Sequence, residues 1–213
     1  MQAGVWRGTN PTIPFSSAWG LVLNLAGVET RAAADGITTL VRADAPCLQL
    51  AIGEVHAAER AVLYQQLHTY PVGNSGEELK GRTHGAKYWI APARRELLVG
   101  FDAMLGIRSD DARLLDAVVQ GVRGEGKGDR YGLPFAGDNN LLFDRIDVVE
   151  EAEPARWYVP LGPASPARKG SCRLTIAIDR ADSSRTTSRV FAPISAAALQ
   201  PPADAWTWAP RAP

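Results

Sequence analysis

The stretch SAWGLVLNLAG, residues 17–27, predicts a buried helix over residues 17–26. Its apolar side chains recur at the spacing of one helix face, at Trp19, Val22, Leu23 and Ala26. Gly27 stands where a helix usually ends, because glycine readily adopts the left-handed conformation of a C-terminal cap. Gly20 inside the helix costs about 1 kcal/mol relative to alanine. We therefore expect the backbone at Gly20 to pack closely against a sheet or a partner.

Downstream of this helix, alternating apolar and polar residues predict strands. Residues 47–55 alternate in this way, and residues 59–70 do so too, although their composition also suits a helix. Further strand-like stretches are residues 87–90, 94–105, 141–149, 156–161, 172–179 and 188–191. A second helix is expected to begin with Ser109 as its N-cap and to end near Gly121.

This order of elements is typical of an α+β domain with a mostly antiparallel sheet. A ferredoxin-like core is the commonest solution for that order, and the later strands predict an additional β region. We expect the core within residues 1–150, with a projecting insertion at about residues 71–86. Residues 151–213 are expected to form a C-terminal β extension with an irregular tail, which packs only through Trp206 and Trp208.

The composition limits the classes of function. Of the 213 residues, 23 are lysine or arginine and 23 are aspartate or glutamate, so the formal net charge is zero. Any nucleic-acid surface must therefore come from local clusters of basic residues. No stretch approaches the roughly 20 apolar residues that span a bilayer, and we see no secretion signal. We expect a cytoplasmic protein without a membrane partner.

The cysteines and histidines do not form a metal-binding pattern. Cys47 and Cys172 lie far apart, and neither they nor His56, His68 and His84 have the spacing of metal ligands. We expect both cysteines to be small buried hydrophobes. We expect no metal site and no cofactor.

The stretch RYGLPFAGDNN, residues 130–140, combines what a loop needs to hold a polyanion. Gly132 and Gly137 permit backbone conformations closed to other residues and allow a partner to approach closely. Successive backbone N–H groups in such a turn can form an anion-binding nest. The other candidate residues supply side chains for binding RNA. Arg130 supplies a positive charge, Tyr131 a flat ring, and Asn139 and Asn140 their side-chain amides. The alternative is a plain reverse turn between two elements.

Basic residues also surround the expected insertion at residues 71–86, which is rich in glycine and poor in large apolar residues and should be mobile. The candidates for RNA contact there are Lys80, Arg82, His84 and Lys87, followed by Arg94 and Arg95. Three aromatic residues interleave with them as stacking platforms: Tyr70, Tyr88 and Trp89. The alternative is a solvated charged loop with aromatic residues in the core.

Two further places offer phosphate contacts. The first helix follows Trp6, Arg7, Thr9 and Asn10. Its N-terminal amides suit a phosphate group, although a simple capping turn explains these residues equally well. A second basic set comprises Arg168, Lys169, Arg173, Arg180, Arg185 and Arg189. This set faces either RNA or acidic patches on neighbouring subunits.

Several stretches resemble the CRISPR-associated Cas-five proteins. NPTIPFSSAWGLVLNLAGVETR, residues 10–31, resembles the family's approach to its first helix, and APARRELLVGFDAMLG, residues 91–106, resembles the strand after its projecting thumb. The loop RYGLPFAGDNN followed by WYVPL resembles the DevS branch of that family. So does the late run LTIAIDRADSSRTTSRVFAPI, residues 174–194.

The resemblance implies a RAMP-superfamily protein with a ferredoxin-like core, acting in antiviral defense within a type I Cascade complex. Members of the family grip the 5′ handle of the CRISPR RNA and contact the backbone and large subunits. They meet target DNA through the complex, where a thumb interleaves with the guide–target duplex. Residues 71–86 fall where that thumb is expected.

One departure from the family concerns the start of the chain. The family normally opens with an apolar strand, whereas here only MQAGVWRGTN, residues 1–10, precedes Pro11. The first strand of a ferredoxin-like sheet is central, so its absence would leave a costly gap. We expect either a start assigned too far downstream or a chain that lacks this strand.

Two other functions stay open beside RNA binding. One branch of the family cleaves precursor CRISPR RNA without metal, a reaction that needs a general base and a charge stabiliser. His84, Lys87 and Tyr88 have suitable chemistry, although a flexible loop holds a base poorly. The other alternative is an assembly subunit with incidental RNA contact. We expect a non-catalytic RNA-binding subunit.

Overall fold

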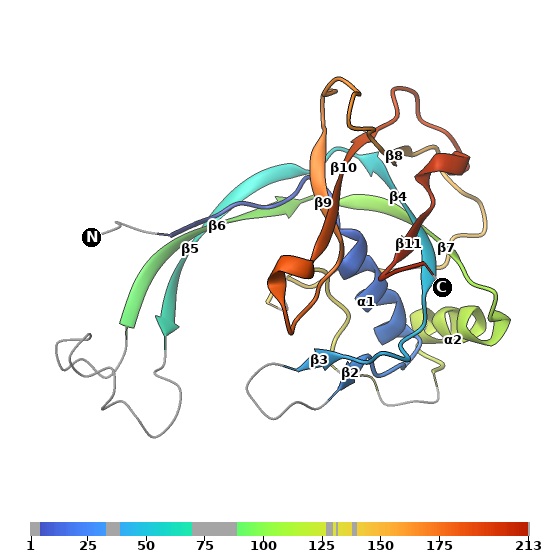
Figure 1. Cartoon of the computed structure of the whole chain (residues 1–213), viewed down its shortest axis with the longest axis horizontal. Helices are drawn as coiled ribbons and strands as arrows, with labels where there is room; N and C mark the ends of the chain where they lie inside the picture. Colours follow the sequence, from blue (N-terminus) through green and yellow to red (C-terminus); the bar gives the residue numbers. More distant parts are fainter. Residues whose placement is uncertain are drawn as a thin grey trace. The chain divides into compact units, whose positions relative to one another are not determined.

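The computed structural model of the chain describes residues 5–32, 39–69, 89–126, 130, 132–137 and 140–212. These residues form helices and mostly antiparallel sheets, which confirms the expected α+β class (Figure 1). The chain divides into two compact units. The smaller unit contains Met1–Thr9 and Ala57–Phe101, and the larger unit contains Asn10–His56 and Asp102–Pro213.

Helix α1 of the larger unit spans Phe15–Leu25 and confirms the expected first helix. It ends as the sequence predicts, with Gly27 in the left-handed region at a φ of 70°. The N–H of Gly27 donates to the Asn24 carbonyl at 3.0 Å, and the N–H of Val28 donates to the Leu23 carbonyl at 2.9 Å. These two bonds satisfy carbonyl groups that the last turn would otherwise leave without a partner.

Gly20 does not pack against the sheet, so this part of the expectation is wrong, whereas packing against a partner stays a prediction. A Cβ atom built at Gly20 would meet no heavy atom within 4 Å among the described residues. Ala18 and Val22, on the side of α1 opposite Gly20, are buried. The glycine therefore lies on the outward side of the helix, where the fold itself does not require it.

Helix α2 spans Ala112–Arg123. Its N-cap is Asp111 and not Ser109, because the Asp111 carboxylate accepts hydrogen bonds from the N–H groups of Arg113 at 3.0 Å and Leu114 at 3.4 Å. A carboxylate at this position satisfies exposed amides and also favours the positive end of the helix dipole. The predicted start is thus displaced by two residues.

The helix α2 continues past Gly121, where the sequence predicts its end, and stops before Gly124 at a φ of 76°. Gly121 is buried because α1 crosses α2 there. A Cβ atom at Gly121 would overlap the carbonyl oxygen of Leu25 and lie 2.7 Å from its carbonyl carbon. Gly121 is therefore a packing residue that lets the two helix backbones approach each other.

The larger unit contains a six-stranded sheet built around one strand, β4 (Figure 1). Its strands are β4 (Leu48–His56), β7 (Asp102–Arg108), β8 (Arg156–Pro160), β9 (Cys172–Ala177), β10 (Thr187–Pro193) and β11 (Thr207–Ala209). β7 pairs along β4, whereas β8 pairs only at Gly53 and Glu54 and β11 only at residues 48–50. A strand has two edges, so β8 and β11 share the edge opposite β7. β10 and then β9 extend the sheet beyond β8.

Four short elements complete the larger unit. β2 (Arg31–Ala32) and β3 (Leu40–Val41) pair with each other in a small sheet. Two 3₁₀ turns, η1 (Ser183–Arg185) and η2 (Ala203–Ala205), precede β10 and β11.

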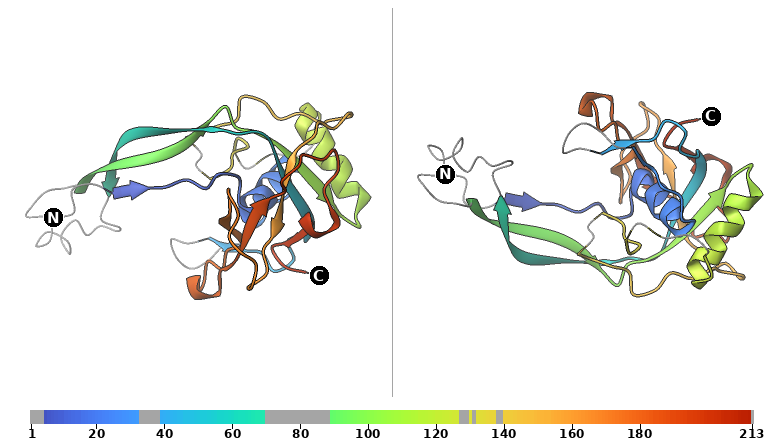
Figure 2. Two further views of the ribbon diagram at one scale, coloured as in Figure 1. Left: turned by 90° about the horizontal axis from the view of Figure 1, so that it is seen from above. Right: turned by 90° about the horizontal axis from the view of Figure 1, so that it is seen from below.

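Helices α1 and α2 pack beside the six-stranded sheet, and the main core lies between them (Figure 2). The rings of Phe15 and Phe191 are both fully buried, with their centres 4.7 Å apart. This contact joins α1 to β10, which lie on opposite sides of residue 150 in the chain. The division of the chain at residue 150 stays a prediction, although the larger unit contains strands from both sides of it.

The predicted strand at residues 141–149 is wrong. These residues contain only an isolated bridge, in which Leu142 pairs with Phe135. Charged residues interrupt the apolar alternation, and the Arg145 guanidinium pairs with its near neighbour Asp147 at 2.6 Å. A local ion pair of this kind needs no partner strand, so the segment runs along the surface as a loop.

The tail is more ordered than the sequence predicts. β11 pairs with β4, and its residues Thr207 and Ala209 are buried. Trp206 also packs, since the Arg108 guanidinium lies 3.7 Å from the centre of its ring, close enough for a cation–π contact. The expectation that only Trp206 and Trp208 hold the tail is therefore wrong.

The smaller unit is a three-stranded sheet of β1 (Val5–Arg7), β6 (Trp89–Val99) and β5 (Glu59–Thr69), with β6 in the middle. β5 and β6 pair antiparallel over their whole length, which confirms the strand at residues 59–70. β1 runs parallel to β6. The residues before Pro11 thus include a short strand that the sequence does not predict.

The rate at which Cys172 is alkylated tests whether β9 is buried in the folded chain. Burial raises the pKa of its thiol to about 11, so the neutral form dominates at pH 8. Because the thiolate is the nucleophile, we expect slow alkylation of Cys172 by iodoacetamide at pH 8 and fast alkylation after unfolding in urea. Peptide mass spectrometry separates Cys172 from Cys47. Rapid labelling of Cys172 in the folded chain would contradict its place at the edge of the core.

Candidate nucleic-acid interface

One face of the smaller unit carries a row of three side chains across its three strands. The pairing register aligns Trp6 of β1 with Arg94 of β6, and Arg94 with Tyr64 of β5. Residues paired in this way project from the same face of a sheet. Trp6, Arg94 and Tyr64 therefore form an aromatic–cation–aromatic row.

The central arginine of this row holds one of the two rings in place. The Arg94 Nε donates a hydrogen bond to the Tyr64 hydroxyl at 3.2 Å, and its guanidinium lies 5.4 Å from the centre of the Tyr64 ring. A neighbouring ion pair is separate, because Glu96 binds Arg60 at 3.2 Å and the N–H of Thr9 at 3.1 Å. Glu96 is thus engaged by Arg60 and by the backbone.

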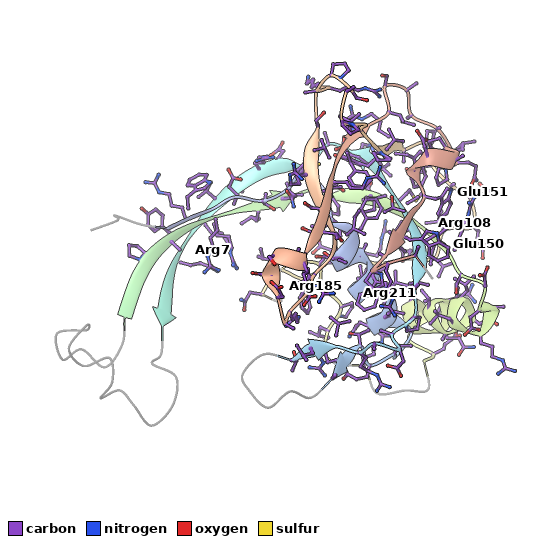
Figure 3. The ribbon with its side chains drawn as sticks, viewed as in Figure 1. Arg7, Arg108, Glu150, Glu151, Arg185 and Arg211 are labelled. Carbon is purple, nitrogen blue, oxygen red and sulfur yellow. The ribbon has the colours of Figure 1, made fainter. Side chains whose placement is uncertain are left out.

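The candidate Arg7 belongs to this sheet and not to the start of α1. It lies in β1 opposite Arg95, on the face away from the Trp6 row (Figure 3). At the start of α1 itself, the N–H groups of Ser17 and Ala18 both donate to the Pro14 carbonyl, at 3.0 and 2.9 Å. The expectation that the amides of the first helix hold a phosphate group stays a prediction.

In the larger unit, the glycine-rich loop has the backbone that its sequence predicts. Gly132 and Gly137 have φ angles of 70° and 94°, in the region that favours glycine. The N–H of Gly132 donates to the Arg130 carbonyl at 3.0 Å. Arg130 also binds α2, because its guanidinium donates to the carbonyl oxygen of Gly121. The loop is thereby tied to the C-terminal end of that helix.

Only some of the other residues of the glycine-rich loop belong to the described part of the chain. Asn140 is exposed at the end of the loop. Tyr131, Asp138 and Asn139 lie outside the described residues. The structure thus brings Arg130, Gly132, Gly137 and Asn140 into one loop.

A cavity of about 360 Å³ lies between this loop and the outward side of α1. Its wall includes Gly20 and Ser16 of α1 and the loop residues Leu133, Phe135 and Gly137. The wall also includes further residues of α1, the segment from Val28 into the β2–β3 pair, the end of β9 with the residues that follow it, and Pro210. The bare backbone at Gly20 therefore faces open space beside the predicted anion-binding loop.

The other predicted basic residues are scattered or lie outside the described part of the chain. Lys80, Arg82, His84 and Lys87 fall outside it, as do Tyr70 and Tyr88. In the second basic set, Arg173 pairs opposite Val190 and Arg189 opposite Leu174, so the two arginines project from opposite faces of the sheet. Arg185 lies 3.5 Å from the Asp179 carboxylate near η1 (Figure 3). Arg173 and Arg189 therefore do not share one face, and contact of the set with RNA or with neighbouring subunits stays a prediction.

Two of the three histidines can be placed on strands. His56 Nδ1 lies 3.0 Å from an Asp102 carboxylate oxygen, and both side chains are exposed. His68 belongs to β5, and His84 lies outside the described residues. Among the described residues, no group of three or more acidic, histidine or cysteine side chains is placed to hold a metal ion. No helix in this part of the chain is long and apolar enough to cross a bilayer.

Sequence reasoning overlooks Tyr64, and it does not place Trp6 on one surface with it. Tyr64 falls within an alternating strand pattern, which reports a strand but not which of its residues face solvent. Trp6 lies in a three-residue strand that forms only by pairing with β6, where its partner Arg94 comes 88 residues later in the sequence. The basic residue Arg94 at the start of the expected strand 94–105 is the available signal.

No family model and no curated protein sequence matches the chain. Ten chains of solved structures match its fold. One of them belongs to a structure described as a CRISPR RNA-guided surveillance complex, with a TM-score of 0.54 and 14% identity. The match covers 92% of this chain and 83% of that chain. At this identity the likeness shows a shared fold.

Proposed function

We propose that this chain is the CRISPR RNA-binding subunit of a type I Cascade effector complex. The observation that carries the proposal is the fold likeness, over 92% of the chain, to a chain of a CRISPR RNA-guided surveillance complex. The stretches that resemble the DevS branch of the Cas-five family support the same assignment. Under this proposal the fold is a RAMP fold with a ferredoxin-like core, and residues 71–86 are its thumb.

The glycine-rich loop would grip the 5′ handle of the guide RNA. Gly132 and Gly137 each have the positive φ angle of a residue that can take part in an anion-binding nest. Arg130 supplies a cation at the base of the loop, and Asn140 supplies an amide at its end. Arg7, Lys80, Arg82, His84 and Lys87 stay further candidates for RNA contact, with Tyr131 and Asn139.

The partners follow from the same proposal. The chain would contact the backbone and large subunits of the complex in the cytoplasm, and it would meet target DNA only through the complex. Sequence specificity for the target would come from guide pairing, since proteins of such complexes mainly read backbone and shape.

The proposal is tested by co-expressing the chain with its neighbouring gene products and sequencing the small RNAs that co-purify with it. We expect uniform guides that share a repeat-derived 5′ end. Recovery of the chain without RNA, or with random fragments, would contradict the proposal.

We also propose that the chain is not a nuclease. Purified protein should leave a repeat RNA intact in the absence of metal, because cleavage needs a positioned general base. Metal-independent cleavage that is lost in a His84→Ala variant would establish the endoribonuclease alternative instead.

Arg130→Ala should weaken RNA retention without unfolding the chain. The change removes one cation near the phosphate groups and the bond that ties the loop to α2. A plot of log affinity against log salt concentration has a negative slope, and each lost phosphate contact makes it less steep by about 1. Titration of a handle RNA at several salt concentrations measures this slope.

Arg145→Ala is the matched control, because Arg145 is exposed and paired with Asp147. Equal slopes for both variants would favour the assembly alternative.

A further inference from the structure

The Trp6–Arg94–Tyr64 row is more exposed than aromatic residues usually are in a folded chain. The exposed fraction is 55% for Trp6 and 70% for Tyr64. Large rings dominate the energetics of cores and interfaces because they carry so much apolar surface. Two such rings on one face of a three-stranded sheet therefore mark a surface that is covered when a partner binds.

The charge of the smaller unit indicates the kind of partner. Its described side chains include four arginines and two glutamates, in a chain whose formal net charge is zero. On the face of the row, Glu96 is already bound to Arg60 and to the N–H of Thr9. The face is therefore left with an excess of positive charge, which complements a polyanion.

The spacing of the row indicates how such a partner would lie. Neighbouring strands are about 4.8 Å apart, so the two rings are separated by two strand spacings, or about 10 Å. This separation is too large for both rings to sandwich one base. It suits two bases, one on each ring, with a phosphate group between them.

We propose that the Trp6–Arg94–Tyr64 row is a stacking platform for two unpaired nucleotides of a single-stranded RNA. The bases lie on Trp6 and Tyr64, and the guanidinium of Arg94 binds the phosphate between them. The inference rests on the proposed function in that the bound polymer is RNA. It adds a second contact surface, because the row belongs to the smaller unit and the glycine-rich loop belongs to the larger one.

Stacking explains the residue types better than base reading does. Every base has a flat face, so aromatic platforms bind single strands with little sequence preference. Arg94 also orients the Tyr64 ring in the free chain, because its Nε donates a hydrogen bond to the Tyr64 hydroxyl. The platform is thereby partly organised in the free chain.

The test uses the purified full chain and a single-stranded RNA that carries 5-iodouridine at each position in turn. We expect photo-crosslinks at Trp6 and Tyr64, located by mass spectrometry of the digested protein. Tyr64→Ala and Trp6→Ala should each weaken binding on the order of tenfold, the size of one lost base–aromatic contact. Tyr64→Phe keeps the flat ring and should retain most of the affinity.

Val62→Ala is the matched control, because Val62 lies on the same strand and face as Tyr64 and is 48% exposed but has no ring. It should bind RNA as the parent does. Crosslinks confined to other residues, or equal affinities for Val62→Ala and Tyr64→Ala, would overturn the platform. So would a Tyr64→Ala chain that binds RNA normally but no longer recovers a partner subunit, since that result assigns the row to a protein interface.

The platform and the proposed function fail in different ways. If co-purified complexes contain no guide RNA, the proposed function fails whatever the crosslinks show. If they contain uniform guides but Tyr64→Ala binds single-stranded RNA as tightly as the parent chain, only the platform is wrong.

Discussion

Gly121→Ala is expected to destabilise the larger unit by about 3 kcal/mol or more. The added methyl group would overlap the carbonyl oxygen of Leu25, at the crossing of α1 and α2. Overpacking a close-packed interior usually costs about 1–3 kcal/mol, when side chains can change rotamer to relieve it. Here the obstacle is backbone, so the two helices must separate. Urea denaturation followed by circular dichroism measures the loss.

Gly20→Ala is the control for this prediction. Gly20 is also a helix glycine, but a methyl group there meets no atom within 4 Å. The change should raise the free energy of unfolding by about 1 kcal/mol, the difference in helix propensity between the two residues. If both variants shifted stability in the same direction, propensity and not helix packing would govern Gly121.

Phe191→Ala is expected to lower the free energy of unfolding by about 3–5 kcal/mol. Phe191 is fully buried, and its ring meets Phe15 of α1 at 4.7 Å between centres. Truncation removes the transfer free energy of the ring and leaves a cavity in the main core. Differential scanning calorimetry of the variant and the parent measures the change. Ile178→Ala, at a residue that is 49% exposed, should stay within about 0.5 kcal/mol of the parent.

The same variant tests how the chain divides into domains. Phe191 and Phe15 lie on either side of residue 150, so loss of their contact should lower the stability of α1 and β10 together. We expect one cooperative transition for the larger unit. A variant in which residues 151–213 melt separately while α1 remains folded would support the predicted boundary at residue 150.

Local patterns predict the elements whose signal lies within a few residues. The helical spacing around Trp19 predicts α1, and Gly27 predicts its end, because both depend on neighbouring residues alone. The strands β4, β5 and β8 follow from alternation in the same way. The positive φ angles of Gly132 and Gly137 agree with the loop that their residue types indicate.

Features that depend on distant partners are missed. β11 forms because it pairs with residues 48–50 of β4, and no pattern within residues 207–209 predicts that pairing. The close approach at Gly121 likewise depends on where α1 ends. For the candidate site, Arg94 could be singled out by its charge, but its alignment with Trp6 and Tyr64 exists only in the paired sheet.

The shared edge of β4 has a consequence for the order in which the chain is made. β4 is synthesised early. β11 covers the edge of β4 at residues 48–50, but it is synthesised about 160 residues later, at residues 207–209. Contacts between such distant segments form slowly, because a long loop must close first. During translation the first half of the larger unit therefore exposes an open strand edge. The nascent chain must be kept from pairing with other strands until residues 207–209 emerge.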